Sequence, residues 1–232
     1  SAASDVYKRQ AGRAAVHTTG SAAVHRRASG TIETVRRTFT PQSVDETTYY
    51  KLLTSTVVPR PIAWVSTTSA DGVPNLAPYS FFTVASSVPP VVQFTSIGRK
   101  DSLRNIEATG EFVINLATEA LFEEVNATSA NYESSISEFS AVGLAEEPSE
   151  TVRPPRVAQS PVSIEATLNR VVEVGNAFVV MGDVTMITVR EGHLADDGLP
   201  AFDALAPLSR LGRNEWGLPP AVRTIDRPTT PR

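Results

Sequence analysis

Apolar and polar residues alternate along much of the chain after residue 50, and this period of two predicts β-strands. The alternation is most regular at residues 162–169, where Val162, Ile164, Ala166 and Leu168 alternate with Ser163, Glu165, Thr167 and Asn169. Such a pattern is typical of an antiparallel strand with one face in the core and the other in solvent. Gly175-Asn176 tolerates the positive φ of a tight turn, so residues 162–189 are predicted to form a long hairpin.

Shorter strands are predicted at residues 62–67, 75–85, 91–95 and 112–117, because these runs are extended or alternating and are bounded by turn signals. Only a few short helices are predicted. Asp101 or Ser102 is expected to cap one that ends at Gly110, and Thr118 is expected to cap another. The proline-containing segment 130–160 is predicted to be loop-like.

Six or seven strands with few helices predict a mainly β protein, folded as a small antiparallel barrel. A parallel doubly wound sheet would need a helix after nearly every strand, and the sequence does not supply them. It also lacks the glycine-rich motifs of dinucleotide-binding and P-loop proteins. Any nucleotide cofactor must therefore be held by the barrel.

The N-terminal segment differs in composition from the rest of the chain. Residues 1–40 carry seven Lys or Arg residues against two acids, with few large apolar residues. Such a stretch buries too little surface to fold, so we expect it to be disordered. It is either an organelle-targeting sequence or a stretch that is not native to the protein. The tail at residues 216–232 is rich in proline and is expected to be irregular.

Composition excludes several classes of site. The 232-residue chain has no cysteine, which excludes disulfides, thiolate nucleophiles and Cys-ligated metals, and which fits a cytoplasmic protein. The three histidines are scattered and form neither a metal set nor a triad. A net charge of −4 argues against nucleic-acid binding. No apolar run approaches the ~20 residues that a membrane span needs.

Gly98, Arg99, Lys100, Asp101 and Ser102 form a turn that opens the first predicted helix, and their chemistry suits a phosphate. Glycine lets the backbone approach closely, the two cations bind phosphate oxygens, and the free amides of a helix N-terminus point at an anion. Asp101 is expected to cap the helix or to orient Lys100. An ordinary solvated helix start with two surface cations is the alternative.

The strands before this turn suit a flat ring and the chain that links it to a phosphate. The candidate residues are Tyr79, Ser80, Phe81, Thr95 and Ser96. Side chains alternate across a strand, so Tyr79 and Phe81 are expected on one face and Ser80 and Phe82 on the other. Plain core packing of the aromatic rings and a polar strand end at Thr95 are the alternatives. These residues and the turn together indicate a phosphorylated aromatic ligand.

Six segments resemble one family in order and spacing: RPIAWVST (60–67), DGVPNLAPYSFF (71–82), GRKDSLRNI (98–106), GEFVINL (110–116), NATSA (126–130) and PPRVAQSPV (154–162). Over residues 45–215 the chain is similar to the flavin reductase-like, FMN-binding split-barrel family, to which flavoredoxin-like proteins belong. The resemblance implies a Greek-key split β-barrel, usually a homodimer, with FMN bound near the subunit interface.

The resemblance also extends the candidate site. Asn126 and Ser129 lie where similar proteins approach the cofactor, although helix C-capping is the alternative for Asn126. The family's usual Lys-Asp-Thr is here Lys100-Asp101-Ser102, which keeps the hydroxyl. Arg60 and Arg210 are lesser phosphate candidates, and each is expected to be a surface cation.

The resemblance implies an NAD(P)H-dependent flavin reductase, in which hydride passes from NADH or NADPH to FMN. The cofactor carries the chemistry, so no catalytic side chain and no metal are predicted. Free flavin or a partner monooxygenase would accept the electrons. Two alternatives are an FMN-binding electron carrier without NAD(P)H activity and a split-barrel protein that has lost its flavin. A pyridoxamine-phosphate-oxidase-like enzyme ranks lower, because its phosphate-binding sequence differs.

Overall fold

The computed structural model describes residues 36–229 of the chain. The chain divides into two units, Ser1–Thr38 and Phe39–Arg232, and every described helix and strand belongs to the second unit. The disorder expected for residues 1–40 therefore falls almost wholly outside the described residues. The longer strands are β2 (Ala63–Thr68), β3 (Pro74–Tyr79), β4 (Phe82–Ser87), β5 (Pro90–Ile97), β6 (Glu111–Leu116), β9 (Val162–Val174) and β10 (Ala177–Val189).

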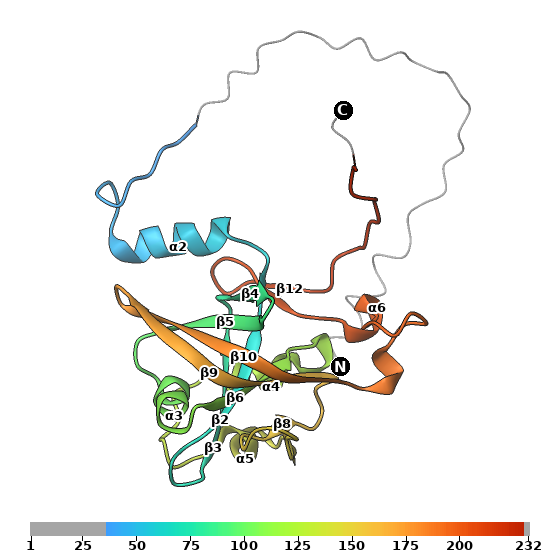
Figure 1. The fold of residues 1–232 in the computed structure, drawn as a ribbon. Coiled ribbons are helices and arrows are strands. Elements are labelled where there is room, and N and C mark those ends of the chain that lie inside the picture. Colours follow the sequence, from blue (N-terminus) through green and yellow to red (C-terminus); the bar gives the residue numbers. More distant parts are fainter. Residues whose placement is uncertain (1–35, 230–232) are drawn as a thin grey trace, which may run out of the picture. The chain divides into compact units, whose positions relative to one another are not determined.

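These seven strands form one antiparallel sheet in the order β3-β2-β6-β9-β10-β5-β4 (Figure 1). The edge strands β3 and β4 are joined by only Ser80 and Phe81, so the sheet curls back on itself into a split β-barrel. The predicted mainly β fold is thus confirmed. The predicted hairpin is also present, because β9 and β10 pair from Ala177↔Val174, beside the Gly175-Asn176 turn, to Val189↔Val162.

Short elements surround the barrel. The α-helices are α2 (Glu46–Thr56), α3 (Asp101–Thr109), α4 (Phe122–Ala127), α5 (Glu138–Val142) and α6 (Phe202–Leu205), and the 3-10 helices are η1 (Glu119–Leu121) and η2 (Glu191–His193). A small separate sheet joins β1 (Arg60–Pro61), β11 (Ser209–Arg210) and β12 (Trp216–Gly217), and β7 (Glu146–Glu147) pairs with β8 (Arg156–Val157). The segment 130–160, predicted to be loop-like, therefore contains α5 and two short strands.

The start of α3 differs from the prediction. Lys100, rather than Asp101 or Ser102, is the N-cap residue, and its side chain makes no capping hydrogen bond. Asp101 and Ser102 are the first two helical residues instead, and the Asp101 carboxylate pairs with Arg104 one turn further on. Gly110 ends the helix with a φ of 74°, as predicted, because glycine adopts this left-handed conformation without strain.

Aromatic side chains fill the inside of the barrel. The ring of Phe94 lies 4.7 Å from that of Tyr79 and 5.7 Å from that of Phe112, centroid to centroid. Gly182 on β10 makes room for the last ring, because a Cβ at this position would lie 2.3 Å from Phe112 Cζ. Helix α3 adds Leu103 to the same buried cluster. The barrel interior is therefore packed with side chains.

A second buried cluster lies on the outer side of β2 and β3. Trp64 and Leu76 pack there against Val125 of α4 and Phe139 of α5. The Trp64 indole donates a hydrogen bond of 2.9 Å to the buried Thr128 hydroxyl, which satisfies the polar end of the ring. Trp64 is therefore a core residue. This cluster fixes the segment after α4 beside the end of β3.

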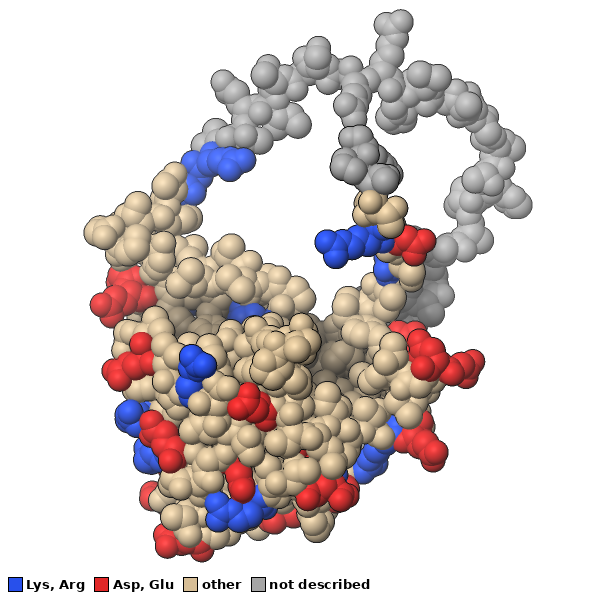
Figure 2. Space-filling model, in the orientation of Figure 1, with Lys and Arg blue, Asp and Glu red and all other residues tan. Residues whose placement is uncertain are grey.

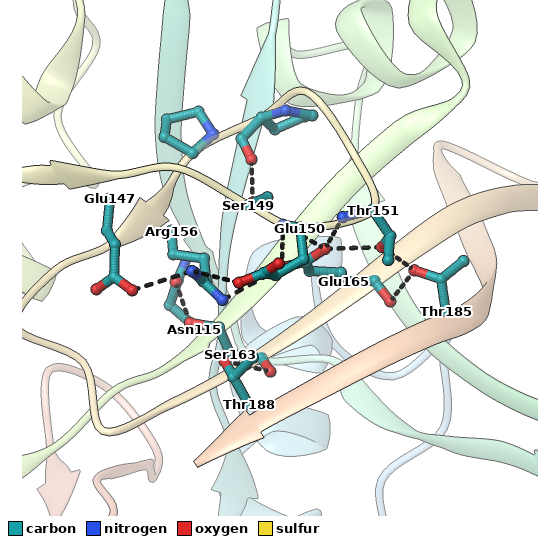
Figure 3. A network of polar contacts seen from close by, with 12 residues as sticks. Asn115, Glu147, Ser149, Glu150, Thr151, Arg156, Ser163, Glu165, Thr185 and Thr188 are labelled. Carbon is teal, nitrogen blue, oxygen red and sulfur yellow. Dashed lines mark hydrogen bonds and ion pairs between the residues drawn. The ribbon is translucent and has the colours of Figure 1, made fainter. Parts of the chain in front are cut away.

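The polar face predicted for β9 is in solvent only at its far end, where Asn169 is exposed and Thr167 is half-buried. Glu165 is fully buried and Ser163 nearly so, because the segment between α5 and β9 covers them (Figure 3). The Glu165 carboxylate accepts hydrogen bonds from the amides of Glu150 and Thr151 and lies 3.5 Å from Arg156. The alternating pattern correctly indicated a strand, but it could not show that a distant segment covers its polar face.

None of the helices within residues 36–229 is long and apolar enough to cross a membrane. The surface in Figure 2 carries acidic and basic side chains next to one another, without a continuous basic patch on this face. Within the described part of the chain, no group of three or more acidic or histidine side chains is placed to hold a metal ion.

Candidate functional site

Three hollows meet around Pro78, near the end of β3. The first, here called the α3 hollow, has a volume of about 320 Å³ and lies at the amino end of α3. Its wall includes Asn75, Pro78, Tyr79, Arg99, Lys100, Asp101, Ser102, Arg104, Ser129 and Glu138. Residues from the turn, from β3 and from the segment after α4 thus come together in one place.

The other two hollows continue from the first. The β4 hollow, of about 110 Å³, is lined by Tyr50, Pro78, Tyr79, Ser80, Phe81, Thr95, Ile97 and Lys100. The C-terminal cavity, of about 600 Å³, is lined by Ile62, Pro78, Ser80, Phe122, Asn126, Ser129, Arg210, Asn214 and Trp216. Shared wall residues (Lys100, Ser80 and Ser129) connect the three spaces, so one extended ligand, or two adjacent ligands, would fit against them.

The charges around the α3 hollow are mainly basic. Arg99 and Arg104 contribute cations, but both are already engaged: Arg99 pairs with Glu107 at 2.5 Å, and Arg104 pairs with Asp101. Lys100 forms no ion pair with any described carboxylate. The helix amides beside it have no side-chain cap. Together they form an anion-binding corner.

A buried carboxylate opposes these cations. Glu138 on α5 accepts a hydrogen bond of 2.8 Å from the amide of Leu76 and lines the α3 hollow. Burial raises the pKa of this carboxyl group, and the charge of Asp101 raises the pKa further, although the hydrogen bond from Leu76 lowers it in part. Glu138 thus fixes β3 beside the hollow.

The Tyr79 hydroxyl is a buried polar group without a hydrogen bond of normal geometry in the described structure. Burial raises the pKa of Tyr79, while the nearby Ser102 and Ser96 hydroxyls lower it in part. Ser102 is also buried, and its oxygen accepts a hydrogen bond of 2.9 Å from the Asn75 amide. Hydroxyl groups therefore gather at the amino end of α3, where a ligand with acceptor atoms would find donors.

The alternation predicted across residues 79–82 is wrong, because the strand is interrupted at Ser80-Phe81. Tyr79 and Phe82 both pack against the barrel core, on either side of this break. Arg60 lies 3.5 Å from the Ser80 hydroxyl through Nε and 5.8 Å from the Phe81 ring centroid. Ser80 and Phe81 are thus turned out of the core, toward the hollows.

Arg60 is not the surface cation expected from the sequence. It is buried, and it donates hydrogen bonds to the carbonyl oxygens of Val57 and Leu211, both at 2.8 Å. Burial lowers the pKa of its guanidinium. Because these bonds join α2, the end of β3 and the C-terminal hairpin, Arg60 holds the walls of the site together.

The candidate residues of the sequence analysis largely meet in the structure. All of them line one of the three hollows except Arg60, Ser96 and Gly98. Ser96 is buried and donates a hydrogen bond of 2.8 Å to the carbonyl of Gly98, so both shape the turn. Asn126 is not the C-cap of α4, which is Thr128, and its position leaves it at the cavity wall.

Sequence reasoning missed Asn75, Arg104, Glu138 and Trp216, and it treated Arg210 as a lesser candidate. Glu138 contacts Leu76 across 62 residues of sequence, so no local pattern reveals that contact. Arg104 lies one helical turn after Lys100, and this spacing places both residues near the start of α3. That signal was available from the sequence.

Comparisons with known proteins find related sequences and related folds. The sequence model described as "Flavin reductase like domain" matches residues 54–206. A protein from Aquifex aeolicus is 37% identical over 179 residues, which are 75% of this chain and 91% of that protein. The Bacillus subtilis protein YwrF is 35% identical over 191 residues, which are 78% of this chain and 93% of that protein.

Solved structures with the same fold include two at nearly 30% identity. Nitrilotriacetate monooxygenase component B from Bacillus cereus is 29% identical, with a TM-score of 0.77 over 82% of this chain and 99% of that chain. The 2-nitrobenzoate 2-nitroreductase NbaA of Pseudomonas fluorescens is 28% identical, with a TM-score of 0.77 over 83% of this chain and 97% of that chain.

Proposed function

Because the chain belongs to the flavin reductase-like domain family, we propose that it binds FMN and acts as an NAD(P)H-dependent flavin oxidoreductase. The observation that carries this proposal is the continuous set of hollows that begins at the anion-binding corner of α3 and reaches Ser80 and Phe81. The phosphate of FMN would suit the anion-binding corner of α3, and its flat ring would suit the end at Ser80 and Phe81.

The residues of the α3 hollow fit a phosphate. Lys100 supplies an uncompensated positive charge, and the first amides of α3 supply donors. The Tyr79 hydroxyl, buried beside the Ser102 and Ser96 hydroxyls without a hydrogen bond of normal geometry, is a further sign that a polar ligand completes this region. Arg99 has a smaller role, because Glu107 and the ring of Phe178, 4.7 Å away, already hold its guanidinium.

The residues around the β4 hollow fit a ring and its linking chain. Ser80 and Thr95 offer hydroxyl groups, and Phe81 offers an aromatic face. A bound flavin would supply the two-electron chemistry of the reaction, and the protein would bind it, orient it and limit the access of water. The proposed reaction uses no acidic or basic side chain of the described residues to transfer a proton. The prediction that the chain provides no catalytic side chain therefore stays a prediction.

The absorbance spectrum of the purified protein tests this function. After FMN is added and unbound ligand is removed, we expect a retained flavin band that NADH or NADPH bleaches under anaerobic conditions. The more effective nucleotide identifies the donor. A retained band that resists both nucleotides would favour an electron carrier. If no flavin is retained and excess free FMN is not turned over either, the proposal is wrong.

We further propose that the protein is a homodimer that delivers electrons to free flavin or to a monooxygenase, as the similarity to a monooxygenase component suggests. Helix α2 offers a surface for contact with a second copy of the chain, because Tyr50 and Leu53 on it and Val57 just after it are exposed, and Thr54 is its only buried residue. Light scattering of the flavin-loaded protein should give the mass of two chains. A monomer that retains flavin would refute this part of the proposal.

A further inference from the structure

Helix α5 places one buried carboxyl group in the wall of the α3 hollow. Glu138 is the first residue of this helix and is only 6% exposed. Its Oε2 accepts a hydrogen bond of 2.8 Å from the amide of Leu76, which ties the side chain to β3. No Lys or Arg within residues 36–229 forms an ion pair with it. Buried carboxylates are usually paired with a cation, so Glu138 is an unusual group at this position.

The unpaired charges of the α3 hollow cancel one another. Both arginines of its wall are already paired with acids, as described above. Lys100 and Glu138 are the two charges of this wall that have no ion-pair partner among the described residues. The hollow therefore offers hydrogen-bond donors to an entering dianion, but little net positive charge.

Other titratable groups face Glu138 from the elements around it. On β3, burial is the main cause that raises the pKa of Tyr79, and the nearby charges of Asp101 and Glu138 add to it. The phenol is therefore neutral at physiological pH and can donate a hydrogen bond. The remaining charged or titratable groups in the walls of the α3 hollow, and of a neighbouring hollow that Glu138 also lines, are Asp71, Arg99, Lys100, Arg104, Tyr132 and Glu133.

The ligand proposed for this corner carries a titratable proton of its own. A phosphate monoester loses its second proton with a pKa of about 6, so it is mainly a dianion at neutral pH. A dianion bound by Lys100 would keep one negative charge near the carboxylate of Glu138, and like charges at close range disfavour the ionised forms. One proton held between the carboxyl group and a phosphate oxygen would remove this repulsion and form a hydrogen bond to a charged group.

We propose that Glu138 makes the α3 hollow selective for an anion that binds together with one proton, as a phosphate monoester does. The proton lies between the Glu138 carboxyl group and a phosphate oxygen; it is taken from solvent on binding and returned to solvent on release. Glu138 is thus a specificity-determining residue. This inference rests on the proposed function, because it places the phosphate of FMN at the anion-binding corner.

The surroundings of Glu138 favour the uptake of this proton. Burial raises the pKa of its carboxyl group, and the charge of Asp101 raises the pKa further, against the hydrogen bond from Leu76. An anion bound nearby would raise the pKa again, because it disfavours the ionised form. A group whose pKa is higher in the complex than in the unliganded protein takes up a proton on binding, so the affinity falls as the pH rises through this range.

Titrations of FMN and riboflavin, followed by quenching of flavin fluorescence, test the proposal between about pH 6 and pH 8, where the unbound phosphate is mainly a dianion. For the native chain, we expect the affinity for FMN to fall by about tenfold across this range, the effect of one unit of pKa shift. Glu138→Gln keeps an acceptor for the Leu76 amide but carries no charge. Its affinity for FMN should be nearly constant, and about tenfold tighter than that of the native chain at the upper end of the range.

Riboflavin, which lacks the phosphate, should bind both chains equally at every pH, and this also shows that Glu138→Gln is folded. Glu133→Gln is the matched control, because Glu133 is exposed, belongs to the segment just before α5, and loses the same charge. It should keep the native pH profile, since exposed charges are screened by salt. Calorimetry in two buffers of different ionisation enthalpy should detect proton uptake with FMN in the native chain, and none in Glu138→Gln.

Two outcomes would overturn the inference while the proposed function stands. If FMN binds to Glu138→Gln with the native pH profile, the titrating proton lies on another group. If riboflavin shows the same dependence on pH as FMN, the phosphate is not involved. If FMN does not bind to the native chain at any pH, the proposed function and this inference fail together, so the two failures are distinguished by the native titration alone.

Discussion

Replacing Arg99 and Lys100 together by alanine is expected to weaken FMN binding by about a hundredfold, because each lost hydrogen bond to a charged group costs about 1.5–3 kcal/mol. Riboflavin, which lacks the phosphate, should bind nearly as before. Lys100→Ala alone should account for most of the loss, since Arg99 is held by Glu107 and Phe178. Quenching of flavin fluorescence in titrations with both ligands measures the two affinities.

The comparison of two ligands separates the phosphate from the ring. Lys51→Ala removes one charge from the exposed face of α2, outside the three hollows, and should leave both affinities unchanged. An equal loss for FMN and riboflavin in the double variant would show that the turn does not bind the phosphate. The anion-binding corner of α3 would then be an ordinary helix start.

Replacing Glu165 by leucine is expected to lower the free energy of unfolding by about 3–5 kcal/mol, the usual cost of removing one partner from a buried ion pair. The carboxylate receives hydrogen bonds from the amides of Glu150 and Thr151 and lies 3.5 Å from Arg156 (Figure 3). Its removal leaves these amide donors without their acceptor and leaves the buried guanidinium with only Glu147, at 3.0 Å, and Glu150. Urea denaturation measures the loss.

Glu150→Gln is the control, because its side chain is exposed and lies 3.9 Å from Arg156, and exposed pairs of this kind contribute about 0–1 kcal/mol. The double variant Glu165→Leu with Arg156→Met should be less destabilised than the sum of the two single variants, because neither buried partner is left alone. A loss for Glu165→Leu no larger than that for Glu150→Gln would contradict the assigned role.

The same network predicts a dependence on pH. Burial alone would raise the pKa of Glu165, but the hydrogen bonds from Glu150 and Thr151 and the charge of Arg156 outweigh burial and hold the pKa below its ordinary value. A carboxyl group whose pKa is lower in the folded state stabilises the fold above its unfolded pKa, and this contribution disappears as the pH falls through the folded pKa. The stability difference between the native chain and Glu165→Leu should therefore narrow in acid.

The fold was largely predictable because the barrel strands carry local signals. The alternation of residues 162–169 and the Gly175-Asn176 turn predicted the β9–β10 hairpin correctly, since both depend only on neighbouring residues. The same alternation failed to predict the burial of Glu165, because burial depends on the segment of residues 149–157, which folds over the strand. Periodicity indicates two faces but does not show what covers them.

The candidate site was predictable where one short segment carried it. The turn from Gly98 to Ser102 lies at the α3 hollow. Its residues are neighbours in the chain, so the sequence alone was enough to single them out. The interruption at Ser80-Phe81 was not predictable, because a continuous strand has the same composition, and the break is maintained by barrel closure between β3 and β4. Arg60 likewise looked like a surface cation, since its carbonyl partners Val57 and Leu211 are brought together only by the fold.

The packed interior of the barrel has a consequence for how this scaffold can diversify. Because Phe112 fills the space that Gly182 leaves open and packs against Phe94, the barrel has no room for a guest molecule, and the three hollows described above lie on its rim. Segments of the rim, such as the hairpin of Arg210 and Trp216, can therefore be exchanged without repacking the barrel interior, although Trp216 contacts the second buried cluster. In protein engineering, a new specificity would be introduced by grafting such loops, with the packed barrel interior left intact.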